Sequence, residues 1–500
     1  MGGFFIALNL WERDMSLSYA EFIEQKRILE KPVGFGADAS LLPANLFDWQ
    51  AEIVKQSCQI GRSAIFAACG LGKSAMQLSW ALQVAHHTRK NVLILAPLAV
   101  GAQTVDEGRK FGITARYIRS MGEIDESCSV YIMNYEMLDH VDASLFGGIV
   151  LDESSILKSL MGKTRAKLIR IFSDTPYKLC CTATPAPNDY TELGNHAEFL
   201  GITTTGKMLA TWFVNDGMES NTWRLKKHAV KDFWAWVSSW AIALNKPSDM
   251  GSEYNDDTFT LPPLKTHKHH IKNTDGYLTN GTLIPMDGIN ATSIKRQMRS
   301  TLAYRIEYAA ELVQKHPDES WLIWCELNQE SEEATKAIPN AVEITGSMPS
   351  EEKARKMLDF ASGKIKILVT KPKIAGFGMN WQICHNIIFI GASFSFESYY
   401  QAVRRCWRFG QEHEVQCHVI LCNNETKIFA AVEAKERKYT AMALGMSNSS
   451  SKDRIVRMNT PYESRKIRLP HFLKPHGATT WSKNISTIGT QSTMAIAATL

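Results

Sequence analysis

Residues 63–74, SAIFAACGLGKS, carry the pattern from which the fold can be predicted. They join an apolar run typical of a buried strand to a glycine-rich turn, and a helical pattern that begins at Lys73 follows. Glycines let main-chain N–H groups approach phosphate oxygens, Lys73 can reach the β and γ phosphates, and Ser74 can ligate magnesium. The general phosphate-loop pattern has glycine at position 67, where this chain has alanine, so a purely structural turn is the alternative.

A second strand-like run, GIVLDESS (residues 148–155), ends in two adjacent carboxylates. Open parallel α/β sheets bind their ligands at the carboxyl ends of strands, which is where Asp152 and Glu153 fall. We expect Asp152 to hold magnesium and Glu153 to orient or deprotonate an attacking water. The Asp-Glu dipeptide is common on protein surfaces, and its weight comes from its position about eighty residues after the glycine loop.

The third informative stretch is QAVRRCWRFGQ, residues 401–411. On a helix, Arg405 and Arg408 would project from one face with their guanidinium groups together. Such a pair suits the charge that accumulates on a transferring γ-phosphate. A basic helix face is more often a solvated surface, which is the alternative.

Alternating apolar and helical patterns predict an α/β fold with two parallel-sheet lobes. In the first lobe the apolar runs are residues 63–67, 91–96, 129–133, 148–151 and 177–181. In the second lobe they are residues 321–325, 341–344, 365–370, 386–390 and 415–421. Because the glycine loop and the acid pair lie in one lobe and the arginines in the other, we expect hydrolysis to need closure of the lobes.

Residues 201–300 break this alternation, and we expect a helical, tryptophan-rich insert and linker between the lobes. The segment holds five of the chain's thirteen tryptophans. Residues 233–244 repeat apolar side chains at helical spacing, which favours an amphipathic helix packed on a lobe. The alternative is a set of tryptophans that stack on nucleic-acid bases beside Arg224, Lys226 and Lys227.

The two ends and the overall composition carry less information. Residues 1–45 form an N-terminal extension, and residues 446–500 form a basic, flexible tail that either contacts phosphates or plays no part. The net charge of +5 permits a polyanionic partner without demanding one. Ten scattered cysteines and the histidines of residues 267–270 lack the spacing of a disulfide framework or a metal site. We expect no membrane segment and no leader, hence a cytoplasmic protein.

Taken together, these stretches resemble the ordered motifs of superfamily-two helicases and translocases, in the Swi/Snf-like branch. The resemblance covers roughly residues 45–425, and residues 401–411 are its most branch-specific part. Ser154 and Ser155 depart from the pattern, in which alanine or glycine and then histidine or aspartate are common. The segments that carry the resemblance are Gln50 and residues 70–74, 96–98, 152–155, 182–185, 376–381 and 401–411.

The resemblance implies two tandem RecA-like lobes, the ATP-binding lobe at residues 46–200 and the second lobe at residues 301–445. It implies ATP and Mg²⁺ as ligands, with Ser74 and Asp152 on the metal. The catalytic residues would be Lys73, Asp152, Glu153, Arg405 and Arg408. The nucleotide-binding residues would be Gln50, which resembles an adenine-reading glutamine, with Gly70, Gly72, Lys73, Ser74, Gly378 and Gln401.

The function that the resemblance implies is an ATP-dependent DNA translocase or helicase, with duplex DNA as the favoured partner. One alternative is a nucleic-acid-stimulated ATPase that acts on RNA or remodels protein–DNA complexes. Another is a non-catalytic subunit that uses ATP as a clamp on DNA, although the retained lysine, acid pair and arginines speak against it. The chain also resembles compact helicases of tailed phages and prophages. Its expected partners are therefore phage replication, recombination or restriction-modification proteins in a bacterial host cell.

Overall fold

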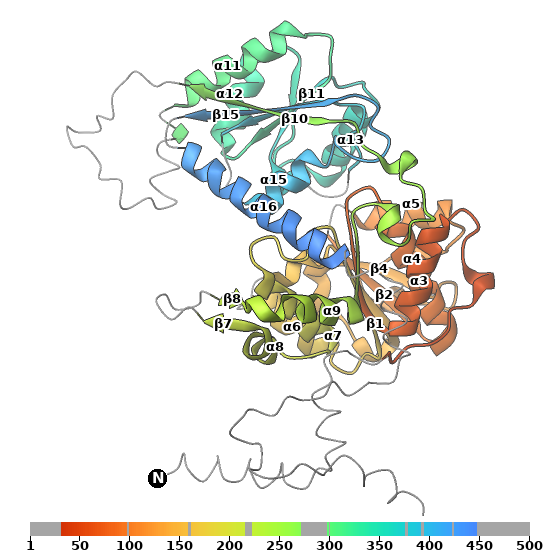
Figure 1. Ribbon diagram of the computed structural model, residues 1–500. Coiled ribbons are helices and arrows are strands. Elements are labelled where there is room, and N and C mark those ends of the chain that lie inside the picture. Colours follow the sequence, from red (N-terminus) through yellow and green to blue (C-terminus); the bar gives the residue numbers. More distant parts are fainter. Residues whose placement is uncertain are drawn as a thin grey trace, which may run out of the picture. The chain divides into compact units, whose positions relative to one another are not determined.

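Two parallel sheets organise the chain (Figure 1). The computed structural model describes residues 32–97, 100–158, 162–215, 223–271, 298–299, 301–375, 379–391, 395–422 and 425–447. All of these residues fall in one compact unit, Met1–Met458. The structure confirms the predicted α/β class with two RecA-like lobes, called lobe 1 (residues 32–259) and lobe 2 (residues 264–447) below. The basic tail and most of the N-terminal extension lie outside the described residues.

Lobe 1 is built on a seven-stranded sheet of order β3-β4-β2-β5-β6-β1-β9, in which every pair is parallel. The five predicted strands are present, and the short strands β3 and β9 are additional. The strands are β1 (Arg62–Ala67), β2 (Asn91–Ala96), β3 (Ala115–Tyr117), β4 (Val130–Asn134), β5 (Phe146–Asp152), β6 (Tyr177–Thr182) and β9 (Ala241–Leu244).

Both faces of this sheet are covered, because successive residues of a strand point to opposite faces. In β1, Ala64 and Phe66 enter one apolar core, and Ile65 and Ala67 enter the other. Helices α3 (Asp48–Ile60), α4 (Lys73–Thr88) and α5 (Gly101–Lys110) cover the second core. Helices α6 (Lys163–Ile171), α7 (Leu193–Leu200), α8 (Thr205–Trp212) and α9 (Val230–Trp240) cover the first, as Figure 1 shows.

Lobe 2 repeats the plan on a six-stranded parallel sheet of order β10-β15-β14-β11-β13-β12. Its strands are β10 (Leu264–Ile271), β11 (Trp321–Cys325), β12 (Ala341–Glu343), β13 (Ile367–Thr370), β14 (Asn386–Ile390) and β15 (Val415–Cys422). Its helices are α11 (Leu302–Lys315), α12 (Asn328–Ala337), α13 (Ser350–Ala361), α14 (Pro372–Ala375), α15 (Phe396–Val403) and α16 (Thr426–Ser447). All five strands that the sequence predicts for this lobe are present.

The segment of residues 201–271 is divided between the lobes, which differs from the expected separate insert. Helix α9 ends at Trp240, and residues 241–244 form β9 beside β1, so the expected helix is wrong over those four residues. A four-residue apolar run fits either structure, and the open edge of β1 decides for a strand. The tryptophan side chains at positions 212, 234, 236 and 240 are buried, which confirms packing over base stacking for these residues.

The expected linker contributes β10, which pairs with β15 from Leu264↔Val415 to Ile271↔Cys422. None of its residues is buried because it is an edge strand of the sheet, so no apolar run marks it. Between α8 and α9, β7 (Phe213–Asn215) and β8 (Trp223–Leu225) form an antiparallel pair. Among the described residues, no helix is long and apolar enough to cross a membrane.

Candidate nucleotide-binding site

The glycine loop of lobe 1 joins β1 to α4 in the geometry that an anion needs. Gly70 and Gly72 have left-handed backbone, with φ of 91° and 73°. A Cβ on Gly72 would lie 2.4 Å from Gln50 Nε2, so a side chain there would collide. No described side chain caps α4, and its first turn holds no acid. The helix therefore presents main-chain N–H groups and the positive end of its dipole to the loop.

The predicted phosphate ligands stand at the start of α4. Lys73 Nζ donates to the main-chain oxygens of Ala67 at 2.8 Å and Ala68 at 3.2 Å, so its ammonium group lies over the loop. Ser74 is the next helical residue and is partly exposed. Both side chains are therefore available to a polyphosphate seated on the loop.

Gln50, the predicted adenine-reading residue, lies against the same loop. Its Nε2 donates to the main-chain oxygen of Leu71 at 3.1 Å, and its Oε1 accepts from Phe47 N at 3.1 Å. The side chain is buried, with 4% of its surface exposed. Gln50 thus fixes the start of α3 to the glycine loop.

The acid pair lies at the carboxyl edge of the same sheet. In the register of the sheet, Asp152 of β5 pairs with Cys181 of β6, and Thr182 pairs with Phe66 of β1. The acid pair and the glycine loop therefore occupy strand ends that are separated only by β6. Burial, reinforced by the neighbouring Glu153, raises the pKa of Asp152 to about 6. A cation beside Asp152 would offset this cost of burying its charge.

Glu153 is held in place by three features. Its φ is 57°, a left-handed conformation that costs a non-glycine residue about 1 kcal/mol or more. Thr182 Oγ1 donates to Glu153 Oε1 at 2.5 Å, and Ser155 Oγ donates to the same oxygen at 2.9 Å. The carboxylate is therefore fixed by the segment of residues 182–185 that the sequence singles out.

Ser154, which departs from the family pattern, has a partner that the sequence did not reveal. Its hydroxyl lies 3.1 Å from His196 Nε2, and both residues are fully buried. Burial lowers the pKa of His196 to about 4, so this imidazole is neutral at pH 7. The pair joins the acid segment to α7.

The two predicted finger arginines gather in lobe 2, but they are not on a helix. Helix α15 ends at Val403, and Arg405 and Arg408 lie in the turns that follow. The helical expectation is therefore wrong at these residues. The side chains still converge, because Arg405 Nη1 and Arg408 Nη1 donate to the same oxygen of Met379, at 3.2 and 3.4 Å. The turns achieve the convergence that a helix face was expected to provide.

Burial lowers the pKa values of both arginines of this pair. It lowers the pKa of Arg405, and together with the neighbouring Arg405 charge it lowers the pKa of Arg408 to about 10. Gln401 accepts from Arg405 Nε at 3.0 Å through its main-chain oxygen. Its buried side-chain nitrogen makes no hydrogen bond to any described atom. Gly378, the remaining predicted nucleotide ligand, lies outside the described residues.

A further arginine brings the glycine loop and the arginine segment together. Arg404 Nη2 donates to the main-chain oxygen of Cys69 at 2.9 Å. Burial alone would raise the pKa of the Cys69 thiol, but the charges of Lys73, Arg404 and Arg405 lower it. A cavity of about 340 Å³ adjoins this contact and is lined by both segments. Sequence reasoning missed Arg404, although it stands beside Arg405.

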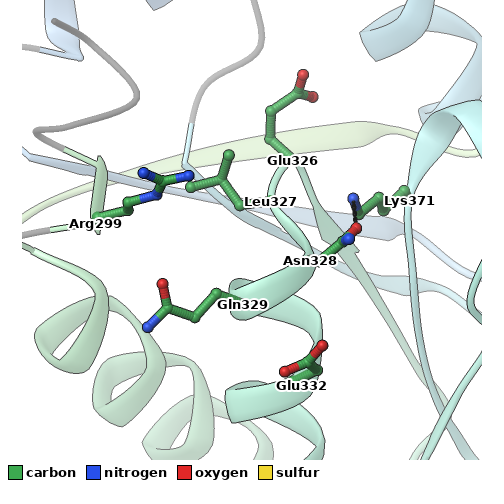
Figure 2. Close-up of a pocket in the computed structure, with 7 residues that line it drawn as sticks. All are labelled: Arg299, Glu326, Leu327, Asn328, Gln329, Glu332 and Lys371. Atoms are coloured by element: carbon green, nitrogen blue, oxygen red, sulfur yellow. Dashed lines mark hydrogen bonds between the residues drawn. The ribbon is translucent and has the colours of Figure 1, made fainter. Parts of the chain in front are cut away.

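A second pocket, of about 620 Å³, lies where β11 leads into α12 in lobe 2 (Figure 2). Its lining residues are Arg299, Glu326, Leu327, Asn328, Gln329, Glu332 and Lys371. Lys371 donates to Asn328 Oδ1. Two cationic and two carboxylate side chains thus line this pocket, so its charge does not single out an anionic ligand.

The fold and the site define a class, a two-lobed parallel α/β protein with an uncapped phosphate loop, a strand-end acid pair and converging arginines. Residues 304–410 match the helicase conserved C-terminal domain. Over 431 residues the chain is 25% identical to the putative protein p41 of Acyrthosiphon pisum secondary endosymbiont phage 1, across 71% of this chain and 87% of the relative. Lobe 2 is thus similar to the helicase conserved C-terminal domain over residues 304–410, and the chain is similar to a phage-encoded protein.

Proposed function

We propose that the protein is an ATP-dependent DNA translocase of the Swi/Snf-like branch of superfamily two, acting with a phage in the bacterial cytoplasm. One observation carries the proposal. The uncapped start of α4 and the Glu153 carboxylate share one sheet edge, and Arg404 ties the arginine segment of lobe 2 to the loop at that edge. The helicase C-terminal match and the phage relative support it.

In this proposal, the residues that lobe 1 contributes to the site bind the phosphates and the magnesium ion of ATP. Main-chain N–H groups around Gly70 and Gly72 and the ammonium of Lys73 bind the phosphates of ATP. The oxygens of Ser74 and Asp152 suit Mg²⁺, which keeps several waters and needs few protein ligands. Bound Mg²⁺ would neutralise charge on the phosphates.

Glu153 orients the attacking water and accepts its proton, since Thr182 and Ser155 fix one carboxylate oxygen. Gln50 reads the base, and Gly378 and Gln401 complete the nucleotide site from lobe 2. Arg405 and Arg408 stabilise the γ-phosphate as charge develops on it. Because they stand on the other lobe, turnover depends on how the lobes meet.

Two variants test the division of labour in the acid pair. Glu153→Gln should keep the affinity for ATP and lose hydrolysis, because the amide cannot accept the proton. Asp152→Ala should also weaken magnesium-dependent binding. Titration of a fluorescent ATP analogue with and without Mg²⁺ measures the affinity of both variants. Equal losses of affinity in the two variants would contradict these roles.

The mode of action is tested on DNA. Duplex DNA should stimulate ATP hydrolysis at least as well as single strands, and stimulation should fall as salt rises because phosphate contacts release counterions. A triplex-displacement assay beside a fork-unwinding assay distinguishes tracking from strand separation. Stimulation by single strands alone, with strong fork unwinding, would favour a true helicase. Stimulation by RNA alone would favour an RNA-dependent ATPase, and binding without turnover a clamp.

A further inference from the structure

Arg404 is not one of the two finger arginines, yet its side chain donates a hydrogen bond to the glycine loop of lobe 1. Its guanidinium carbon lies 4.8 Å from the ring centre of Trp407 and 5.7 Å from that of Tyr400. Only 6% of the residue is exposed. A buried guanidinium that lies beside two aromatic rings has little freedom to reorient, and its Nη2 donates to the main-chain oxygen of Cys69.

The contact continues from Arg404 into α16. The ring of Tyr400 lies 5.5 Å from the ring of Tyr439, between ring centres. The hydroxyl of Tyr439 donates to the main-chain oxygen of Ala183 at 2.5 Å. Ala183 follows the last residue of β6, so its carbonyl belongs to the turn at the sheet edge and not to the strand.

Ala183 is covalently next to the residue that holds Glu153. Thr182 Oγ1 donates to Glu153 Oε1 at 2.5 Å and accepts from Thr184 N at 3.0 Å. A hydrogen bond on the carbonyl between Thr182 and Thr184 therefore restrains the turn that aims the Thr182 hydroxyl. One chain of contacts thus runs from the glycine loop through Arg404, Tyr400 and Tyr439 to Glu153.

We propose that Tyr439 is a positioning residue for ATP hydrolysis, which holds Glu153 through the turn at Ala183 and is coupled through Tyr400 to Arg404 at the glycine loop. This inference rests on the proposed function. It assigns a role to α16, which carries none of the segments that resemble the helicase motifs. Tyr400 belongs to α15, and Tyr439 belongs to α16, which packs on the cores of both lobes. These two helices therefore connect lobe 2 to the glycine loop and to Glu153.

The test compares two tyrosines in DNA-stimulated turnover. Tyr439→Phe keeps the ring and removes the hydroxyl, so kcat should fall by about 3- to 10-fold, the usual effect of one hydrogen bond. The KM for ATP should stay within about twofold of the parent value. The thermal midpoint should stay within about 2 °C of that of the parent protein. The matched control is Tyr399→Phe, whose hydroxyl faces Cys417 Sγ at 3.8 Å inside lobe 2 and should leave kcat unchanged.

A double variant tests the coupling to the glycine loop. Arg404→Lys should lower kcat alone, and adding Tyr439→Phe should cost less than the product of the two single losses. Equal kcat in Tyr439→Phe and Tyr399→Phe would overturn the inference, as would losses that multiply. If KM and the thermal midpoint moved beyond these limits together with kcat, the variant would have loosened the structure in general. That result would also overturn the inference. If the parent protein shows no turnover, the proposed function itself fails, which is a separate outcome.

Discussion

The two lobes contain the same kind of strand-to-helix junction, and they use it in opposite ways. In lobe 1, α4 follows β1 through a glycine loop, and no described side chain caps its start. In lobe 2, α12 follows β11, and Glu330 Oε2 accepts from the main-chain nitrogens of Glu326 at 2.8 Å and Leu327 at 2.9 Å. The negative charge of Glu330 at the start of α12 disfavours an anion there, whereas the first turn of α4 holds no acid.

The first prediction concerns one lysine in each lobe, Lys73 and Lys371. Lys73→Ala should lower ATP turnover by about 10³-fold or more, because no neighbouring group replaces its charge on the phosphates. Lys371→Ala removes a lysine at the lobe 2 junction and should change basal turnover by less than about threefold. Steady-state hydrolysis without DNA measures both. Similar losses in the two variants would contradict the assignment of the phosphate site to lobe 1.

The second prediction concerns the carboxylate that closes the lobe 2 junction. Glu330 also pairs with Arg305 at 2.8 Å, and both side chains are fully buried. Glu330→Ala should destabilise lobe 2 by about 3–5 kcal/mol, because it leaves a buried guanidinium without its partner. Hydrogen exchange of the β11 and β14 amides measures the loss, and the β2 and β5 amides of lobe 1 serve as the internal reference.

The exposed Glu332 provides the control on the same helix. Glu332→Ala should change the free energy of opening, measured by hydrogen exchange in lobe 2, by no more than about 0.5 kcal/mol. If Glu330→Ala left exchange in β11 unaltered, the carboxylate would have no structural task there. The contrast between an open and a closed helix start would then lose its physical basis.

The third prediction concerns the pH dependence of stability in each lobe. The folded pKa of His196 is about 4, below the 6.5 of an unperturbed histidine. As pH falls, the unfolded chain therefore binds the proton first, and stability is lost between about pH 6.5 and pH 4. At pH 5 the loss from this one group is about 2 kcal/mol, at 1.36 kcal/mol per pH unit.

His196→Gln should remove that share of the pH dependence from lobe 1 while lobe 2 keeps its own. In lobe 2, burial and the nearby His269 and His267 lower the pKa of His418 to about 4. Hydrogen exchange at pH 7 and pH 5, resolved by lobe, separates the two contributions. An unchanged pH dependence in lobe 1 of the variant would rule out His196 as its source.

The sequence predicted the parts of the fold that are marked by continuous apolar runs. All ten predicted strands are present, and most of them are buried on both faces, which requires apolar side chains throughout. The edge strands β3, β9 and β10 escaped prediction, and the last two did so for different reasons. Residues 241–244 continue the helical spacing of α9, and residues 264–271 are mostly polar. What fixes both strands is a free sheet edge, which no local pattern records.

In the candidate site, too, the local motifs could be predicted from the sequence and the contacts between distant residues could not. The glycine loop and the acid pair are visible because each is a local motif on a predicted strand. The contacts that hold them join distant residues: Glu153 and Thr182 are 29 apart, Ser154 and His196 are 42 apart, and Cys69 and Arg404 are 335 apart. The Ser154 partner in particular has no local signal, since His196 lies within an ordinary helix. Such contacts follow from the assembled fold and not from any one segment.

Helix α16 also constrains how the chain can be made. Met442 and Met446 belong to the same apolar core as Phe66 and Leu93, which are encoded more than three hundred residues earlier. A ribosome releases those early residues long before the two methionines, so the core of lobe 1 waits for its last side chains until lobe 2 has been synthesised. Translation that stops before residue 442 would leave apolar surface of lobe 1 exposed to proteases and chaperones. The two lobes are thus separate in architecture but form a single unit in biogenesis.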